Sequence, residues 1–516
     1  MIGQRTNATS RGLRCTGSRG RLSVDPSRIF VTVLLLATLL VACGGGAGAP
    51  TSVSGVSVTL DSTEIAVGEQ VSASATVQGT GSPSQGVTWS TSESAIATVD
   101  ASGLVSGAGT GTAEVIATSQ ADGTVSGNAT ITVVPAIAVS CSAPKAFSGA
   151  ITTDTTIERD CYDVTGVVSV SGGATLTIAP GTIMRFANTS GVKVEIDGAL
   201  IAAGTATEPI VLRGNVASAA AWLGLHVRSG DPRNVLDHVT VEYAGRHNTS
   251  FHNSAQTQFR SGVRLAGSGA RLSITNSTLR GNDNTGIRLG GGVTLDDFVN
   301  NVFDANAGTP MIIESNQIGM LDAASDYAGD TGVIGENTLN HIDVRGSTVT
   351  LSQTWPAVSV PYRLSGFTLI DDASAAITVQ PGARFQGSSA SGIRVDAGSF
   401  AARGTADERI VFSGTSPSAG AWLGIYFRSN DAGNALEFVT VEDGGQHNTS
   451  FTGTAQTQIA ANVRVAGDAR LELEDSLLRN SLNAGLYLAA SSELTPFDPN
   501  ETNTFESNDV DVVDPR

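Results

Sequence analysis

The stretch Ala174-Thr175-Leu176-Thr177-Ile178-Ala179-Pro180-Gly181-Thr182 contains the pattern that decides the fold of most of this chain. Alternating apolar and polar residues predict a short β-strand with one buried face, and the Pro-Gly pair predicts a sharp turn after it. The pattern returns at Ile377-Thr378-Val379-Gln380-Pro381-Gly382. Further short strands are expected at 192–196, 210–212 and 272–274, separated by turns rich in Gly and Asn, which tolerate left-handed backbone. Short strands without an obvious hairpin partner nearby indicate a solenoid.

A longer stretch is duplicated with an offset of 200 residues. Residues 221–258 and 421–458 are identical at 23 of 38 positions, which excludes chance similarity. Such self-similarity predicts stacked units that bury their apolar faces against their neighbours. Eight polar residues in the duplicated segment are candidate ligand-binding residues: Arg228, Glu242, His247, Asn248, Arg428, Glu442, His447 and Asn448.

Two interpretations of this segment compete. Polar groups beside Trp222 or Trp422 could bind sugar hydroxyls. Alternatively, the tryptophans belong to the core and the polar residues hydrogen-bond their own loops. We expect both tryptophans to be buried, and the His-Asn-Thr-Ser-Phe loops at 247–251 and 447–451 to face solvent.

The segment from about 146 to 510 resembles the right-handed parallel β-helix of the pectin-lyase-like superfamily. The resemblance rests on 174–182 and 198–206, and on their counterparts at 377–382 and 398–406. It implies a rod of stacked coils within a domain that spans residues 136–516. The duplication divides the rod into copies at about 146–345 and 346–510.

This resemblance also implies an alternative function, because the superfamily contains polysaccharide lyases and hydrolases. A similar lyase would need a calcium-binding carboxylate cluster and an Arg or Lys base, and a hydrolase would need paired carboxylates. The doublets Asp296-Asp297 and Asp371-Asp372 have no counterpart in the other copy, and adjacent residues on a strand point to opposite faces. We therefore predict no catalytic residue, metal site or cofactor, and keep a polysaccharide lyase or hydrolase as the alternative.

Residues 53–135 resemble the bacterial immunoglobulin-like domain, group 2. The matching segments are Val87-Thr88-Trp89-Ser90, 95–100, 103–107 and 111–113. The resemblance implies a β-sandwich, usually a spacer in surface proteins, and we expect Trp89 in its core.

The first 42 residues have the three parts of an export signal. An arginine-rich region precedes an apolar run at 29–40, which is too short to span a bilayer of roughly 30 Å. The segment Leu40-Val41-Ala42-Cys43 resembles the lipobox of bacterial lipoproteins, which implies cleavage before Cys43 and a lipid on its sulfur. Residues 43–52 then form a flexible tether. Gly44 implies export to the outer membrane, since Asp at this position would retain a Gram-negative lipoprotein.

The mature chain is strongly acidic. The first 42 residues hold six of the 30 basic and one of the 48 acidic residues, so that their removal leaves a net charge of about −23. Such a surface repels nucleic acid. The expected partners are the membrane through the lipid on Cys43, and a polysaccharide or another surface protein. Cys141 and Cys161 remain as a pair, for which export predicts a disulfide.

Together these features predict an all-β cell-envelope lipoprotein without catalytic activity. An Ig-like sandwich is followed by a β-helical rod that serves surface structure, adhesion or glycan binding.

Overall fold

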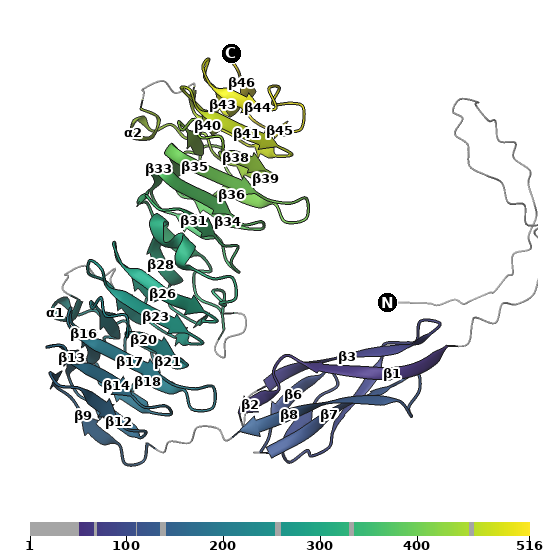
Figure 1. The fold of residues 1–516 in the computed structure, drawn as a ribbon, viewed down its shortest axis with the longest axis vertical. Helices are drawn as coiled ribbons and strands as arrows, with labels where there is room; N and C mark the ends of the chain where they lie inside the picture. The colour runs from purple at the N-terminus through teal and green to yellow at the C-terminus, as the bar shows by residue number, and fades with distance from the viewer. Residues whose placement is uncertain are drawn as a thin grey trace, which may run out of the picture.

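The computed structural model describes residues 51–66, 70–109, 111–134, 141–252, 260–329, 335–453 and 459–516. Within these residues a β-sandwich precedes a long stack of parallel strands (Figure 1). The predicted fold class, an Ig-like sandwich followed by a parallel β-helix, is confirmed. The expected signal segment, Cys43 and most of the expected tether lie outside the described residues.

Two four-stranded sheets form the sandwich. One contains, in order, β1 (Ser52–Leu60), β3 (Gln70–Thr80), β6 (Leu104–Gly107) and β5 (Ala97–Val99). The other contains β2 (Glu64–Ala66), β8 (Ser126–Val134), β7 (Gly111–Ser119) and β4 (Val87–Thr91). Alternate residues of β7 are buried, as a strand with one face on a core requires. Trp89 is partly buried and packs against the core around Val105, Val115 and Ile131, as expected.

The first part of the rod has three faces, because each coil gives one strand to each of three parallel sheets. A seven-stranded sheet contains β9 (Lys145–Phe147), β12 (Cys161–Val164), β15 (Ile183–Phe186), β18 (Ile210–Gly214), β21 (Val239–Glu242), β24 (Thr278–Arg280) and β27 (Val302–Asp304). A six-stranded sheet contains β11 (Thr155–Ile157), β14 (Thr175–Ile178), β17 (Ala199–Ala203), β20 (Val235–Asp237), β23 (Arg271–Thr275) and β26 (Thr294–Val299).

The third face belongs to a 14-stranded sheet that runs through both copies. Its strands are β10 (Ala150–Ile151), β13 (Val167–Val170), β16 (Gly191–Val194), β19 (Leu225–Val227), β22 (Val263–Leu265), β25 (Thr285–Leu289), β28 (Thr309–Glu314), β29 (Ile342–Arg345), β32 (Tyr362–Leu364), β34 (Arg384–Gly387), β36 (Ile410–Gly414), β39 (Val439–Glu442), β42 (Leu477–Arg479) and β45 (Thr504–Glu506).

An 11-stranded sheet completes the second copy. It contains β30 (Thr348–Val349), β31 (Gln353–Trp355), β33 (Phe367–Val379), β35 (Gly392–Arg403), β37 (Ile425–Phe427), β38 (Ala435–Glu437), β40 (Ala461–Val465), β41 (Arg470–Glu474), β43 (Ala484–Leu488), β44 (Glu493–Thr495) and β46 (Val510–Val513). The helices are short: α1 (Thr249–His252), α2 (Thr449–Thr452) and the 3-10 helix η2 (Ser315–Met320).

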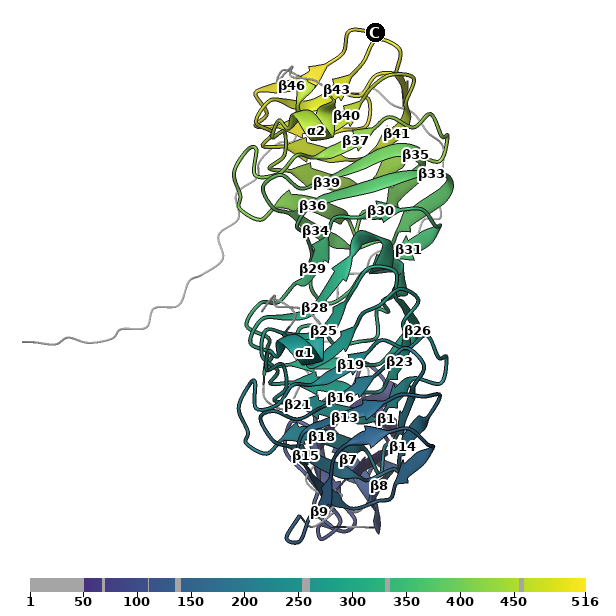
Figure 2. The same ribbon diagram turned by 90° about the vertical axis from the view of Figure 1, so that its left-hand side faces the viewer.

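The two copies are alike coil by coil, but equivalent strands do not share one sheet. In the first copy β16, β19, β22 and β25 belong to the 14-stranded sheet, whereas their counterparts β35, β37, β40 and β43 belong to the 11-stranded sheet. The change occurs where β28 pairs with β29 and the sheet continues to β32 and β34. Figure 2 shows the two copies end to end along the rod.

Strands of successive coils pair in register, so that equivalent side chains form columns along the rod. Val170, Val194, Val227, Leu265 and Leu289 form one such column, and all five are buried. Because side chains alternate across a strand, the neighbouring column faces outward. The inward columns make up the core, and the outward columns are free to carry polar chemistry.

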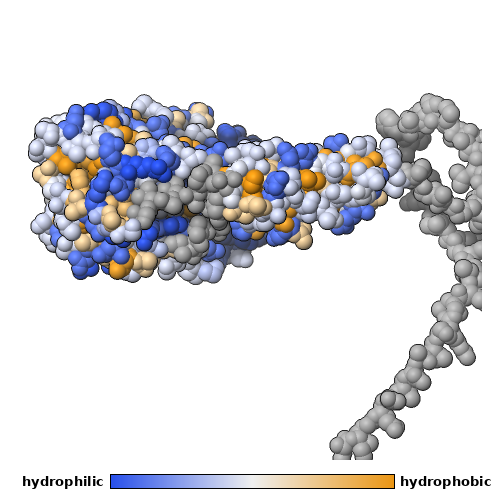
Figure 3. All heavy atoms as spheres, turned by 90° about the horizontal axis from the view of Figure 1, so that it is seen from below, coloured by the Kyte–Doolittle hydropathy of each residue, from blue (hydrophilic) through white to orange (hydrophobic). Residues whose placement is uncertain are grey.

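The N-terminal coil of the rod is closed by the Cys141–Cys161 disulfide, whose Cα atoms lie 5.2 Å apart. The predicted bond is therefore confirmed. Surface hydrophobic residues lie scattered among hydrophilic ones on the face in Figure 3. Within the described ranges, no helix combines the length and apolarity needed to cross a membrane.

Candidate functional site

Both duplicated tryptophans belong to the core, as predicted. The side chains of Trp222 and Trp422 are 0% exposed. Each indole N–H donates a 2.8 Å hydrogen bond to a backbone carbonyl, that of Glu242 or Glu442. The Trp222 ring also stacks on Phe186, with centroids 4.1 Å apart. Each ring packs in the core between neighbouring sheets of the rod, and it therefore offers no surface to a sugar.

Glu242 and Glu442 form ion pairs on a different sheet from Arg228. The carboxylate of Glu242, on β21, is 4% exposed and accepts a 2.7 Å hydrogen bond from Nε of Arg280. In the second copy Glu442, on β39, accepts a 2.6 Å hydrogen bond from Arg479. The structure therefore separates these glutamates from the other candidate residues, because β19 and β21 lie in different sheets.

Arg228 and Arg428 occupy equivalent positions directly after β19 and β37. Arg228 donates a 2.6 Å hydrogen bond to Glu195, and Arg428 donates a 3.1 Å hydrogen bond to Asp396. Both pairs lie on the outward surface of the coil. The same ion pair is thus built in each copy.

His247, Asn248 and their counterparts lie at the start of the two short helices. The side-chain oxygen of Asn248 accepts a hydrogen bond from the backbone of Phe251, and Asn448 does the same for Ser450 and Phe451. These asparagines are helix caps. The His247 ring stacks on His252, with centroids 5.5 Å apart. His247 and His447 are half-buried and the following Thr-Ser pairs are exposed, so the expectation of solvent-facing loops holds in part.

Helices α1 and α2 pack over the same outward column in the two copies. In the first copy, Nδ1 of His226 lies 2.8 Å from the carbonyl oxygen of Phe251, and Arg264 donates to the carbonyl of His252. In the second copy, Arg394 donates to the carbonyl of Phe451, whose ring packs on Tyr426. The helices therefore cover one side of this column.

This outward column is the feature that the sequence analysis missed. In the first copy it consists of Lys193, His226, Arg264 and Arg288, on β16, β19, β22 and β25. We name it the first ladder. In the second copy the equivalent column, the second ladder, consists of Arg394, Tyr426, Arg464 and Tyr487. A signal was present: the 200-residue offset continues through 263–267 and 463–467, where Val, Arg, Ala and Gly recur around Arg264 and Arg464.

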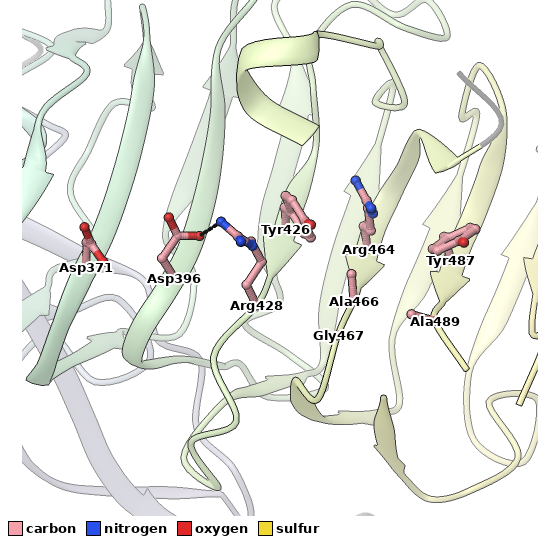
Figure 4. Close-up of a pocket in the computed structure, with 9 residues that line it drawn as sticks. All are labelled: Asp371, Asp396, Tyr426, Arg428, Arg464, Ala466, Gly467, Tyr487 and Ala489. Carbon is pink, nitrogen blue, oxygen red and sulfur yellow. Dashed lines mark hydrogen bonds and ion pairs between the residues drawn. The ribbon is translucent and has the colours of Figure 1, made fainter. Parts of the chain in front are cut away.

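One wall of a cleft of about 590 Å³ is formed by three residues of the second ladder, Tyr426, Arg464 and Tyr487 (Figure 4). The guanidinium of Arg464 lies between two rings, 4.3 Å from the centroid of Tyr426 and 5.6 Å from that of Tyr487. Cation–π attraction stabilises such an arrangement. The remaining lining residues are Asp371, Asp396, Arg428, Ala466, Gly467 and Ala489.

The family comparisons divide the chain in the same way as the fold. Residues 52–133 match the model of the bacterial Ig-like domain (group 2), and residues 149–271 match the pectate-lyase-like beta helix domain. The chain carries both domains. The second match includes Lys193, His226 and Arg264 of the first ladder, and the internal duplication extends the same architecture to the second copy. No curated protein matches the chain.

The first ladder of the β-helix domain is cationic through its lysine and arginines. Burial lowers the pKa of His226 to about 3, although the hydrogen bond to Phe251 acts in the opposite direction, and burial lowers the pKa of His252 to about 4. Both imidazoles are therefore uncharged at neutral pH. Burial also lowers the pKa of Arg264 and Arg288 to about 10, so that both stay charged.

The acidic residue beside the first ladder is held as a carboxylate. Burial alone would raise the pKa of Glu195, but hydrogen bonds from Lys193 and Arg228 outweigh it, and the pKa lies below its ordinary value. Among the described residues, no group of three or more His, Cys, Asp or Glu side chains is placed to hold a metal ion. The arrangement can donate hydrogen bonds to, and attract, oxygen-rich ligands along the rod.

Proposed function

We propose that this chain is a non-catalytic cell-envelope lipoprotein whose β-helical rod binds glycans. A lipid on Cys43 attaches it to the outer membrane, and the Ig-like domain acts as a spacer between membrane and rod. The observation that supports the proposal is that both copies of the rod have an equivalent outward face. Both copies place an arginine at the same point of the ladder, Arg264 and Arg464, beside the ion pair made by Arg228 or Arg428.

The geometry of the ladders suits an extended polymer. Parallel strands stack about 4.8 Å apart, so the ladder residues recur at short intervals along the rod. His226, Arg288 and Tyr426 are buried, and a chain that follows the rod would meet the partly exposed ladder residues: Lys193, Arg264, Arg394, Arg464 and Tyr487. Guanidinium groups donate several hydrogen bonds in a fixed plane and carboxylates accept them, which matches the alternating donors and acceptors of sugar hydroxyls. The proposal therefore places the ligand along the rod.

The alternative, a polysaccharide lyase or hydrolase, fits the ladder residues less well. A glycosidase acid needs a raised pKa, whereas the pKa of Glu195 is lowered. One observation favours a lyase: Arg264 and Arg288 lie on adjacent strands with a pKa of about 10. At pH 7 only about one in a thousand such side chains is deprotonated, which makes a weak supply of base.

The lipid anchor is tested by metabolic labelling with a radioactive fatty acid. Cys43→Ala should abolish labelling and leave the precursor uncleaved, because the lipid is attached to this sulfur. Cys15→Ala, within the signal segment, is the matched control and should label normally. Labelling that persists in Cys43→Ala would exclude the lipoprotein.

Glycan binding is tested with the mature protein in gels that contain neutral or acidic polysaccharides. The double variant Arg264→Ala/Arg464→Ala should weaken retardation by about tenfold or more, as the loss of a charged hydrogen bond predicts. Arg470→Ala, an exposed arginine paired with Glu493, is the control and should bind normally. Equal retardation of all three proteins would refute the proposal. Release of unsaturated products or new reducing ends would replace it with the enzymatic alternative.

A further inference from the structure

The outward faces of the two copies differ in chemistry at several positions. Arg288 of the first ladder is replaced by Tyr487 in the second, and Ser171 is replaced by Asp371. We propose that the cleft of the second copy binds neutral sugar units, with Tyr487 as the ring against which a sugar packs. The inference rests on the proposed function, because it assigns a ligand class to one of the two faces.

Tyr487 is the aromatic side chain that reaches the cleft. Tyr426 lines the same cleft but is only 4% exposed, because the Phe451 ring of α2 lies 5.9 Å from it and Arg464 covers its face. Tyr426 therefore positions Arg464. Tyr487, two strands further along, is half-buried with part of its ring at the cleft surface (Figure 4). A half-exposed tyrosine offers both an apolar face and a hydroxyl.

The floor of the cleft leaves room for a ring beside Tyr487. Ala466, Gly467 and Ala489 follow β40 and β43 and carry no side chain larger than a methyl group. The larger side chains stand at the edges of this floor, in a row across neighbouring strands in Figure 4. A sugar that packs on Tyr487 would lie over these small residues.

The cleft contains polar groups of opposite kinds: Asp371 stands at one end of the row in Figure 4, and Arg464 stands beside Tyr487. Asp371 is exposed, and in the described part of the chain no ion pair or side-chain hydrogen bond engages its carboxylate. Arg464 makes a long hydrogen bond of 3.4 Å to the carbonyl of Thr452, and among the described residues no carboxylate forms an ion pair with it. Asp371 thus offers an acceptor and Arg464 a donor. A hydroxyl can satisfy either, whereas an anionic group can satisfy only the arginine.

The charges on the two faces also favour a neutral ligand in the second cleft. The first face has four cations and one carboxylate: Lys193, Arg228, Arg264, Arg288 and Glu195. The second face has three cations and two carboxylates: Arg394, Arg428, Arg464, Asp371 and Asp396. Arg394 and Arg428 share the carboxylate of Asp396, at 2.9 and 3.1 Å, and Asp371 adds a second negative charge. The second cleft is therefore close to neutral, and it has less attraction for an acidic polymer than the first face.

The test measures binding of defined oligosaccharides to the mature protein by calorimetry and saturation-transfer NMR. The neutral probes are the hexasaccharides of cellulose, xylan, mannan and laminarin, and the acidic probe is the hexasaccharide of galacturonate. At least one neutral probe should bind saturably. Tyr487→Ala should weaken that binding about tenfold or more, and Tyr487→Phe should retain most of it, because the ring remains. Arg470→Ala, an exposed arginine outside both ladders, is the control and should not change neutral binding.

A second variant tests the inference even if Tyr487→Ala fails to fold. Asp371 is exposed, so Asp371→Ala leaves the core intact and should weaken the same neutral probe about tenfold. If the acidic probe alone binds, or if Arg470→Ala weakens neutral binding as much as Tyr487→Ala does, this inference fails and the proposed function stands. If none of the five probes and none of the polysaccharides binds, both fail.

Discussion

Acidification should destabilise the first copy through His226, and the duplication supplies the residue that removes the effect. His226 is buried beneath α1, between Lys193 and Arg264 on the adjacent strands, with His252 and His247 close by. A proton on His226 would add a charge between two existing cations. The second copy has Tyr426 at this position, a side chain without an imidazole. His226→Tyr is therefore the perturbation.

The magnitude follows from the depressed pKa of His226. Between its folded value of about 3 and the ordinary value of 6.5, the unfolded chain binds a proton that the folded chain does not. Stability is therefore fully present above pH 6.5 and is lost as the pH falls toward 3. At pH 5, which lies 1.5 units below 6.5, the loss amounts to about 2 kcal/mol at about 1.36 kcal/mol per unit. His252 adds a loss in the same direction that His226→Tyr leaves in place.

Two measurements check this prediction. NMR titration of labelled imidazoles should show that His226 is still mostly uncharged at pH 4. Pulse proteolysis in urea at pH 8 and pH 5, with cleavage mapped to the first copy by mass spectrometry, should show that wild type loses about 2 kcal/mol more than His226→Tyr. An imidazole that titrates near 6.5, or an equal loss in both proteins, would refute the reasoning.

Three further predictions concern the core, the buried ion pair and the disulfide. Trp222→Ala should lower the free energy of unfolding by about 3–5 kcal/mol, because the substitution opens a cavity beside Phe186. Urea unfolding measures this free energy, and a loss below about 1 kcal/mol would contradict core burial of Trp222. Glu242→Gln should destabilise more than Glu442→Gln, because the side chain of Glu242 is 4% exposed and that of Glu442 is 20% exposed; the reverse order in thermal unfolding would be inconsistent with this. Cys141→Ser/Cys161→Ser should cost about 3 kcal/mol for a 20-residue loop, and unchanged urea unfolding would exclude a stabilising role.

Local patterns predicted the strands well, because a strand with one buried face has apolar residues at every second position of the sequence. The run at 174–182 became β14, which ends at Ile178, and Gly181 in the following turn has a φ of 73°. The burial of Trp222 and Trp422 followed from their apolar neighbours. These are short-range properties, which a few adjacent residues determine.

The composition of the candidate site depended on longer-range geometry. Arg228 and Glu242 are only 14 residues apart, yet they lie on different faces, because the chain turns two corners between β19 and β21. Arg264 follows His226 by 38 residues, whereas Arg288 follows Arg264 by only 24. Because the loops between these strands differ in length, the ladder residues do not recur at a fixed spacing in the sequence. Only the pairing of strands in the structure aligns them.

The Cys141–Cys161 bond changes the path of force through the molecule. A pull on the chain from its N-terminal side enters the rod at Cys141 and passes through the sulfur atoms to Cys161, the first residue of β12. The tension thus bypasses residues 142–160, and the first contact that bears load is the pairing of β12 with β15. Beyond this point, the hydrogen bonds between coils lie along the rod, so steady tension would release one coil at a time. Each release would lengthen the chain and lower the tension on the coils that remain folded.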